Sequence, residues 1–307
     1  MKITGNKIRR TRLKKGMSQS ELAKGACTQA TISLIENSNH CSNIEIMEKI
    51  CSKLNLELDE VVDLKSHGER SLIEVEDYIH NKEWQQALDR LKKINILNLE
   101  SRKMKGWYDL CVATADFGLS KDADDAIYTF NTILNGDFFD ELDYRRTLTM
   151  IGLGMAYSQK NQIKRAQTFF ELAFDQLKAI MELKKYDVKK VTDTYILLVL
   201  EVFSIENFEL TKTVADHCIN KLIDNDKTKA ICLMYLFYGF SATKIGDFNI
   251  GIQSFFCASE LQKKGSFDLN ILKDQKLDYK NIFGNVLAKM DEFTCETVET
   301  FSKNDPF

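Results

Sequence analysis

Apolar positions in the first 65 residues recur at a spacing that predicts five short helices. They repeat every three or four residues within the segments 5–15, 18–26, 29–36, 43–54 and 58–63, which is the period of an amphipathic helix. Helices this short are marginal on their own in water, so we expect the five to pack together as a compact bundle. The expected core consists of Ile8, Leu13, Leu22, Ala23, Ile32, Ile35, Ile46, Ile50, Leu54, Leu58 and Val61.

The start of the second segment carries a specific local signal. Ser18 is followed three residues later by Glu21, which is the spacing of a capping box at a helix N-terminus. Gly16 lies just before it, and glycine commonly ends a preceding helix. The second and third helices are therefore expected to be separated by a tight turn at residues 26–28.

From residue 68 onward the pattern repeats about every 40 residues. A period of this length is typical of stacked helical repeats. Small residues occupy equivalent places in five successive units, namely Ala87, Ala126, Ala166, Thr211 and Gly251. The third unit carries the tetratricopeptide pattern as Leu153-Gly154, Tyr157, Ala166, Phe170 and Ala173, and the fifth carries it as Tyr235, Tyr238-Gly239, Gly251, Phe255 and Ala258.

Composition extends the helical prediction to the whole chain. The only proline is Pro306, and there are 14 glycines in 307 residues, so helix breakers are rare. We predict an all-α fold with a helix-turn-helix bundle over residues 1–66 and a right-handed tetratricopeptide-like α-solenoid over 67–307. The solenoid would contain about five repeats and a capping helix at about 270–290, and residues 65–69 are expected to be a hinge.

Charge is distributed unevenly along the chain. The formal net charge is −3, but the first 26 residues carry many cations and one acidic residue, Glu21. A basic segment in an acidic chain indicates a polyanionic partner, although a solvated charged helix face is an alternative. The cations are Lys2, Lys7, Arg9, Arg10, Arg12, Lys14, Lys15 and Lys24.

The first domain resembles the lambda-repressor-like helix-turn-helix domains of XRE type. The matching residues are Ile8-Arg9, Arg12, the runs 15–19 and 21–23, and the run 28–37. In that family the third helix lies in the major groove of double-stranded DNA. The resemblance implies that Gln29, Ala30, Thr31 and Ser33 face the bases and that Arg9, Arg12, Lys15, Ser18 and Gln19 meet phosphates.

Two finer expectations follow from the same resemblance. Gln19 would both bond a phosphate and support Gln29, whereas Glu36 would form a structural pair with Arg9 or Arg12. One such domain reads a half-site, so we expect a homodimer on a near-palindromic operator.

The combination of this domain with the repeats resembles the Rgg/PlcR-type regulators of Gram-positive bacteria along the full length. The resemblance implies that a short signalling peptide binds the concave face of the repeats, as in quorum sensing, and changes the state of a dimer. Filling of a mostly apolar face by ordinary packing remains an alternative, as does a ligand-independent repressor whose repeats serve dimerisation or partner binding. The expected groove residues are Tyr108, Ile151, Met155, Gln159, Ile196, Leu200, Leu236, Phe240 and Lys244.

Other classes of function lack support in the sequence. There is no glycine-rich phosphate loop, H-E-x-x-H or G-x-S-x-G motif, so we do not expect an enzyme or a cofactor. The eight cysteines include no C-x-x-C pair, which favours reduced core residues over a metal site. No apolar run approaches the roughly 20 residues of a membrane span, and we expect a cytoplasmic protein.

Overall fold

The computed structural model describes residues 2–41, 43–58, 61–63, 66–99, 101–222 and 228–265. The chain divides into two compact units, Met1–Ile73 and Glu74–Phe307. The division falls inside one continuous helix, α5 (His67–His80). Residues 67–69 of the expected hinge therefore begin a helix, while Lys65 lies outside the described residues.

The first unit contains a bundle of four helices whose bounds agree with the predicted ones to within three residues. Leu22, Ile32 and Ile50 are fully buried at its centre. Ser18 caps α2 with the expected capping box, in which its hydroxyl accepts from Glu21 N. The helices are α1 (Gly5–Lys14), α2 (Gln19–Ala23), α3 (Gln29–Ser38) and α4 (Ile44–Leu54).

The predicted fifth helix, 58–63, is wrong. Val62–Asp63 forms a short strand, β2, which pairs antiparallel with β1 (Lys2–Ile3). β-branched residues such as Val62 favour strands, and the start of the chain supplies a partner that local periodicity does not reveal. Val61 is still buried as expected.

One expected core residue of the bundle lies on its surface. Leu13 on α1 is 58% exposed. Met47 on α4 is fully buried, although it is not among the expected core residues. The helical period identifies an apolar face only to within about one residue, so a leucine at the edge of that face can point outward.

The second unit consists of five consecutive helix pairs in the described part of the chain, as the 40-residue period predicts. Each pair is a first (A) helix followed by a second (B) helix. A 3-10 turn at Ile96–Asn98 lies between the first two pairs. The pairs are α5 with α6 (Trp84–Leu91), α7 (Arg102–Ser120) with α8 (Ala123–Asn135), α9 (Tyr144–Gln159) with α10 (Ile163–Met181), α11 (Val188–Ser204) with α12 (Phe208–Leu222), and α13 (Thr228–Lys244) with α14 (Phe248–Gly265).

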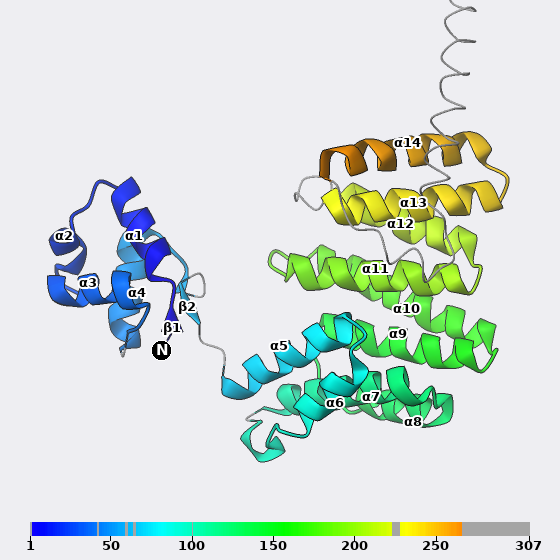
Figure 1. Cartoon of the computed structure of the whole chain (residues 1–307), viewed down its shortest axis with the longest axis horizontal. Coiled ribbons are helices and arrows are strands. Elements are labelled where there is room, and N and C mark those ends of the chain that lie inside the picture. The colour runs from blue at the N-terminus through cyan, green and yellow to red at the C-terminus, as the bar shows by residue number, and fades with distance from the viewer. Residues whose placement is uncertain are drawn as a thin grey trace, which may run out of the picture. The chain divides into compact units, whose positions relative to one another are not determined.

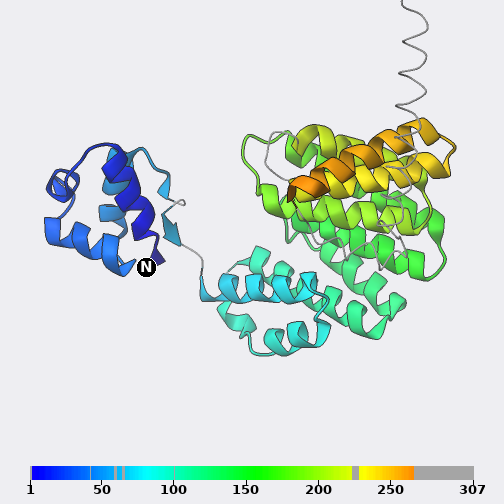
Figure 2. The same cartoon turned by 45° about the horizontal axis from the view of Figure 1, so that its top comes forward.

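Neighbouring pairs stack in chain order. α7 contacts α9, α9 contacts α11 and α11 contacts α13, so the A helices from α7 to α13 form a continuous layer. Figure 1 shows the stack from α8 to α14, with the helices nearly parallel. Figure 2 shows α13 and α14 side by side at one end of it. The all-α tetratricopeptide-like prediction is confirmed, and the predicted cap at 270–290 lies outside the described residues.

Small residues let the helices of a pair approach closely. Ala87, Ala126, Ala166, Thr211 and Gly251 each lie near the start of a B helix, and all five are buried. The third pair shows why size matters, because a Cβ atom added to Gly154 on α9 would lie 2.3 Å from Phe170 Cε1 on α10. The tetratricopeptide pattern in the sequence is therefore a packing pattern.

Candidate functional site

Helix α3 presents a polar surface at its N-terminal end. The Thr28 hydroxyl caps the helix by accepting from Thr31 N. Gln29 and Ala30, in the first turn, are exposed, while Thr31 and Ser33 are half-buried. All four residues predicted to face bases thus have side chains on or near the surface, although contact with DNA stays a prediction.

A chain of hydrogen bonds connects this surface to the core. Gln29 Nε2 donates to Gln19 Oε1 at 2.6 Å, and Gln19 Nε2 donates to Glu36 Oε2 at 2.9 Å. Glu36 is 3% exposed. The expected support of Gln29 by Gln19 is present, and it continues into a buried carboxylate.

Arg12 completes this network from the interior. Its Nε donates to Glu36 Oε1 at 2.6 Å, its Nη2 donates to Glu36 Oε2 at 2.9 Å, and its Nη1 donates to Met17 O. Because Arg12 is 6% exposed, it is not placed to meet a phosphate, and that assignment needs correction. The expected pairing of Glu36 with Arg12 is confirmed.

The ionisation of Glu36 reflects competing effects. Burial raises the pKa of this carboxyl, but the hydrogen bonds from Arg12 and Gln19 and the charges of Arg12 and Arg9 together lower it below its usual value. Glu36 is therefore a carboxylate at neutral pH and holds the Gln19 amide in a fixed orientation.

The remaining residues assigned to phosphates have different environments. Arg9 is exposed on α1. Lys15 Nζ donates to Lys53 O at 3.1 Å across the domain surface. The Ser18 hydroxyl is occupied by its bonds with Glu21. Arg9 thus stays the least constrained of these phosphate candidates.

Leu34 is an exposed apolar residue that is not among the predicted DNA-contact residues. It lies one turn after Ala30 on α3 and is 59% exposed. A helical period places residues four apart on the same face, so Leu34 extends the surface that begins at Ala30. The signal was available in the sequence as an apolar residue that follows the polar face of α3.

Several predicted groove residues are buried in the core of the second unit. Ile151 and Leu236 are fully buried, and Leu200 and Phe240 are each 7% exposed. Phe240 packs edge-on against Phe255, with ring centroids 5.0 Å apart. In this conformation the four side chains belong to the hydrophobic core of the repeats and are not exposed in a groove.

The other predicted groove residues reach solvent. Tyr108, Met155 and Ile196 are half-buried on three successive A helices, α7, α9 and α11. Gln159 and Lys244 are exposed at the last positions of α9 and α13. These five of the nine predicted residues are therefore accessible to a ligand without rearrangement.

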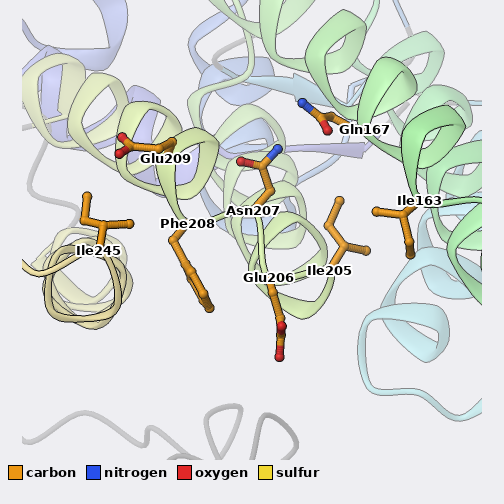
Figure 3. Close-up of a pocket in the computed structure, with 8 residues that line it drawn as sticks. All are labelled: Ile163, Gln167, Ile205, Glu206, Asn207, Phe208, Glu209 and Ile245. Atoms are coloured by element: carbon orange, nitrogen blue, oxygen red, sulfur yellow. The ribbon is translucent and has the colours of Figure 1, made fainter.

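A separate pocket of about 400 Å³ opens beside the loops that connect A and B helices. Figure 3 shows the side chains around it. None of the predicted groove residues lines this pocket. Its lining comes from α10, α12 and the loops that precede α12 and α14, and consists of Ile163, Gln167, Ile205, Glu206, Asn207, Phe208, Glu209 and Ile245.

Two further properties concern only the described part of the chain. No helix there is both long and apolar enough to cross a membrane. No group of three or more His, Cys, Asp or Glu side chains in the same residues could hold a metal ion.

Comparisons with known proteins agree with this geometry. Residues 8–61 match the family model described as Helix-turn-helix. A comparison with curated proteins found no matching sequence.

Among solved structures, the chain is similar to PlcR of Bacillus thuringiensis in complex with the peptide PapR7 and DNA, with 16% identity and a TM-score of 0.55 over 92% of this chain and 99% of that one. It also matches the SHP pheromone receptor Rgg2 of Streptococcus dysgalactiae, with 16% identity and a TM-score of 0.49 over 92% and 99% of the two chains. At such identities the likeness concerns the fold. Residues 8–61 are thus an XRE-type helix-turn-helix domain, and the chain, in which this domain precedes tetratricopeptide-like repeats, has a fold similar to that of PlcR.

Proposed function

We propose that this protein is a sequence-specific DNA-binding transcriptional regulator whose repeats bind a short signalling peptide. The observation that carries the DNA-binding half is the hydrogen-bonded series that runs from the exposed Gln29 through Gln19 to the buried Glu36 of a helix-turn-helix domain. A glutamine held in this way is suited to bidentate bonding with adenine. The regulator acts as a cytoplasmic homodimer on a near-palindromic operator.

The peptide-binding half rests on fold and accessibility together. PlcR was solved with a peptide and DNA, and the present chain shares that fold. Tyr108, Met155 and Ile196 are half-buried on the successive A helices α7, α9 and α11, and we infer that they contribute apolar and polar contacts to an extended chain. Repeat proteins commonly bind peptides along such layers.

The alternative is a ligand-independent repressor whose repeats serve dimerisation or a protein partner. The burial of Ile151, Leu200, Leu236 and Phe240 favours this alternative, because these side chains already have partners within the chain. The two functions differ in whether a short peptide changes the DNA affinity of the full chain.

The DNA-binding proposal is tested by selecting bound sequences from a random double-stranded library with the full chain. We expect an enriched near-palindromic motif, whose footprint disappears in Gln29→Ala while the dimer mass in solution is unchanged. Absence of any enriched motif would contradict a sequence-specific regulator, and an unchanged footprint would contradict the role of α3.

The peptide proposal is tested on the same complex. A library of short synthetic apolar peptides is screened by thermal shift of the full chain, and peptides that raise the melting temperature are titrated into the DNA complex. We expect some peptide to change the DNA affinity. If no peptide of the library raises the melting temperature and none changes the DNA affinity, the ligand-independent alternative is favoured.

A further inference from the structure

One side chain of the first A helix bridges to two later A helices. Tyr144 Oη, on α9, donates a hydrogen bond to Glu76 Oε1 at 3.3 Å, and Lys190 Nζ, on α11, pairs with Glu76 Oε2. Glu76 lies on α5. A single carboxylate therefore connects the first, third and fourth helix pairs of the stack.

The groups that receive Glu76 form a site for a carboxylate. Tyr144 is the first residue of α9, and Lys190 lies in the first turn of α11, where the aligned peptide dipoles favour negative charge. Burial and the neighbouring Glu76 raise the pKa of Tyr144 far above its usual value, so its hydroxyl keeps the proton that it donates. Side-chain exposures of 15% for Glu76 and 26% for Lys190 show that solvent reaches the site.

Two unsatisfied donors lie next to this site. The Arg145 guanidinium carbon is 4.0 Å from the centre of the Trp107 ring and 4.6 Å from that of Tyr144. Among the residues that the structure describes, Arg145 Nε and Trp107 Nε1 are buried without a hydrogen-bond partner. Leaving a buried donor unpaired is unfavourable, so an acceptor that reaches them from outside the chain would stabilise this region.

We propose that Glu76 occupies, in the ligand-free protein, a subsite for a carboxylate of the peptide ligand, and that the incoming carboxylate displaces Glu76 from Tyr144 and Lys190. This inference rests on the proposed peptide binding and adds the chemistry of the ligand. The carboxylate is the C-terminus of the peptide or an acidic side chain.

Displacement of Glu76 by the ligand would change the contacts of helix α5. α5 is the helix in which the division between the two units falls. Lys82, just after α5, also attracts the half-buried Glu201 of α11, so Glu76 and Lys82 both couple this region to α11. A ligand that replaces Glu76 frees α5 from one of these interactions and thereby changes the helix that continues toward the first unit.

Glu76 competes with the ligand carboxylate for the subsite and therefore affects the apparent affinity of the ligand. While Glu76 fills the subsite, only the fraction of molecules with an open subsite binds the ligand carboxylate, which lowers the apparent affinity by that fraction. Removing the charge of Glu76 is therefore expected to strengthen binding of a carboxylate and to leave binding of an uncharged analogue unchanged.

The test compares Glu76→Gln with Glu74→Gln in the full chain. Glu74 is a matched control because it also lies on α5 and pairs with an arginine, Arg90, of the adjacent helix α6. The probes are three forms of acetyl-Leu-Leu-Phe: the free acid, the C-terminal amide, and an amide with an added internal glutamate. Thermal unfolding checks that both variants fold.

We expect Glu76→Gln to bind the free acid, the glutamate-containing amide or both about tenfold more tightly than wild type does, and the plain amide with wild-type affinity. The arm that gains affinity identifies the source of the carboxylate. An unchanged affinity for both acids, or an equal gain for the plain amide, would overturn the subsite. Glu74→Gln is expected to match wild type.

Acetate provides a probe that does not depend on peptide binding. Trp107 lies beside the site, so its fluorescence should respond when acetate enters Glu76→Gln and should not respond in the double variant with Lys190→Met. If no peptide binds any variant, the proposed function fails, and the acetate response alone decides the subsite. Lack of that response would then overturn the subsite as well.

Discussion

Gln29 Nε2 lies 2.6 Å from Gln19 Oε1, and this hydrogen bond joins an exposed side chain of α3 to the start of α2. Gln19 is held in turn by the buried carboxylate of Glu36. Side-chain ordering is one of the costs of binding. A glutamine that is already oriented before DNA arrives avoids part of that cost.

This arrangement predicts a graded effect of two substitutions. Gln29→Ala removes the proposed base-reading group and should abolish specific binding, whereas Gln19→Ala leaves Gln29 in place but free to rotate and should weaken specific binding about tenfold. Electrophoretic mobility shift with the selected operator measures both. Gln85→Ala, on α6 of the second unit, is the control, and wild-type affinity for Gln19→Ala would contradict the supporting role.

The exposed Leu34 predicts a change in sequence preference. On the proposed DNA-reading surface its side chain would make apolar contact with a thymine methyl group, so Leu34→Gln should alter the base preferred at one position of each half-site while leaving the melting temperature unchanged. Binding-site selection with the variant measures this effect.

Leu13→Gln is a matched control for Leu34→Gln because Leu13 is 58% exposed on α1 and Leu34 is 59% exposed on α3. We expect the control to select the wild-type motif. If both variants select that motif, Leu34 is not part of the base-reading surface.

The sequence predicted the elements of the DNA-binding surface better than the partners of its charged residues. Arg9 and Arg12 are both basic residues of α1, yet Arg9 is exposed and Arg12 is buried against Glu36. Only the position of α3 relative to α1 distinguishes them, and that depends on long-range packing. For the same reason the strand at Val62–Asp63 was missed, since its partner lies some 60 residues earlier in the chain.

In the repeats, the period of small residues predicted the helix pairs, but no local pattern indicated which side chains of the A helices the stacking would bury. Counting offsets from the motif placed Ile151 and Leu236 on an inner face, but both are fully buried. The bridge from Glu76 to Lys190 joins the first helix pair to the fourth, and no local spacing could indicate it.

The ion pair between Arg12 and Glu36 predicts acid sensitivity of the first unit. The pKa of Glu36 in the folded chain is lower than the usual value of 4.5, so its stabilising contribution is complete above that value and is lost as the pH falls through the lower, folded pKa. Acidification below pH 4.5 should therefore destabilise α1–α4. Amide hydrogen exchange, corrected for its intrinsic pH dependence, measures this in the full chain.

Glu36→Gln should lower the free energy of unfolding of the same helices by about 3 kcal/mol at pH 7, because it leaves the buried Arg12 charge without its counter-ion. This variant should also lack the part of the acid-induced loss of stability that protonation of Glu36 causes. Glu48→Gln, on the exposed face of α4, is the control. An equal acid response in wild type and Glu36→Gln would assign the sensitivity to other groups.

For Gly154→Ala, we expect the effect of packing on stability to be opposite in sign to the effect of helix propensity. Alanine in a helix is favoured over glycine by about 1 kcal/mol, but a Cβ at this position would lie 2.3 Å from Phe170 Cε1. The fully buried Phe170 has little room to move, so Gly154→Ala should destabilise the repeats by about 1–3 kcal/mol. Urea unfolding followed by circular dichroism measures the change.

In a Phe170→Leu background, Gly154→Ala should cost less stability than it does in wild type, because the smaller side chain removes the clash. The measurement compares the double variant with Phe170→Leu alone. A stabilised Gly154→Ala single variant would show that α9 and α10 adjust at no cost.

Glu201 on α11 predicts a second pH dependence, opposite in sign to that of Glu36. Burial raises the pKa of this carboxyl to about 7, although Lys82 and Lys121 act to lower it. The folded state therefore retains a proton that the unfolded chain releases near pH 4.5. The free energy of unfolding should fall as the pH rises from 4.5 to 7 and then level off, by about 3 kcal/mol in all.

Glu201→Gln keeps the shape of the protonated side chain and cannot ionise, so it should flatten this part of the pH profile and make the repeats more stable than wild type at pH 8. At pH 4, where Glu201 is protonated in the folded chain, the two proteins should have similar stability. Urea unfolding at both pH values measures the difference, and Glu209→Gln, at an exposed position of α12, controls for the loss of one negative charge. A stabilisation at pH 8 that Glu209→Gln reproduces would reflect net charge, whereas one confined to Glu201→Gln reflects the burial of this carboxylate.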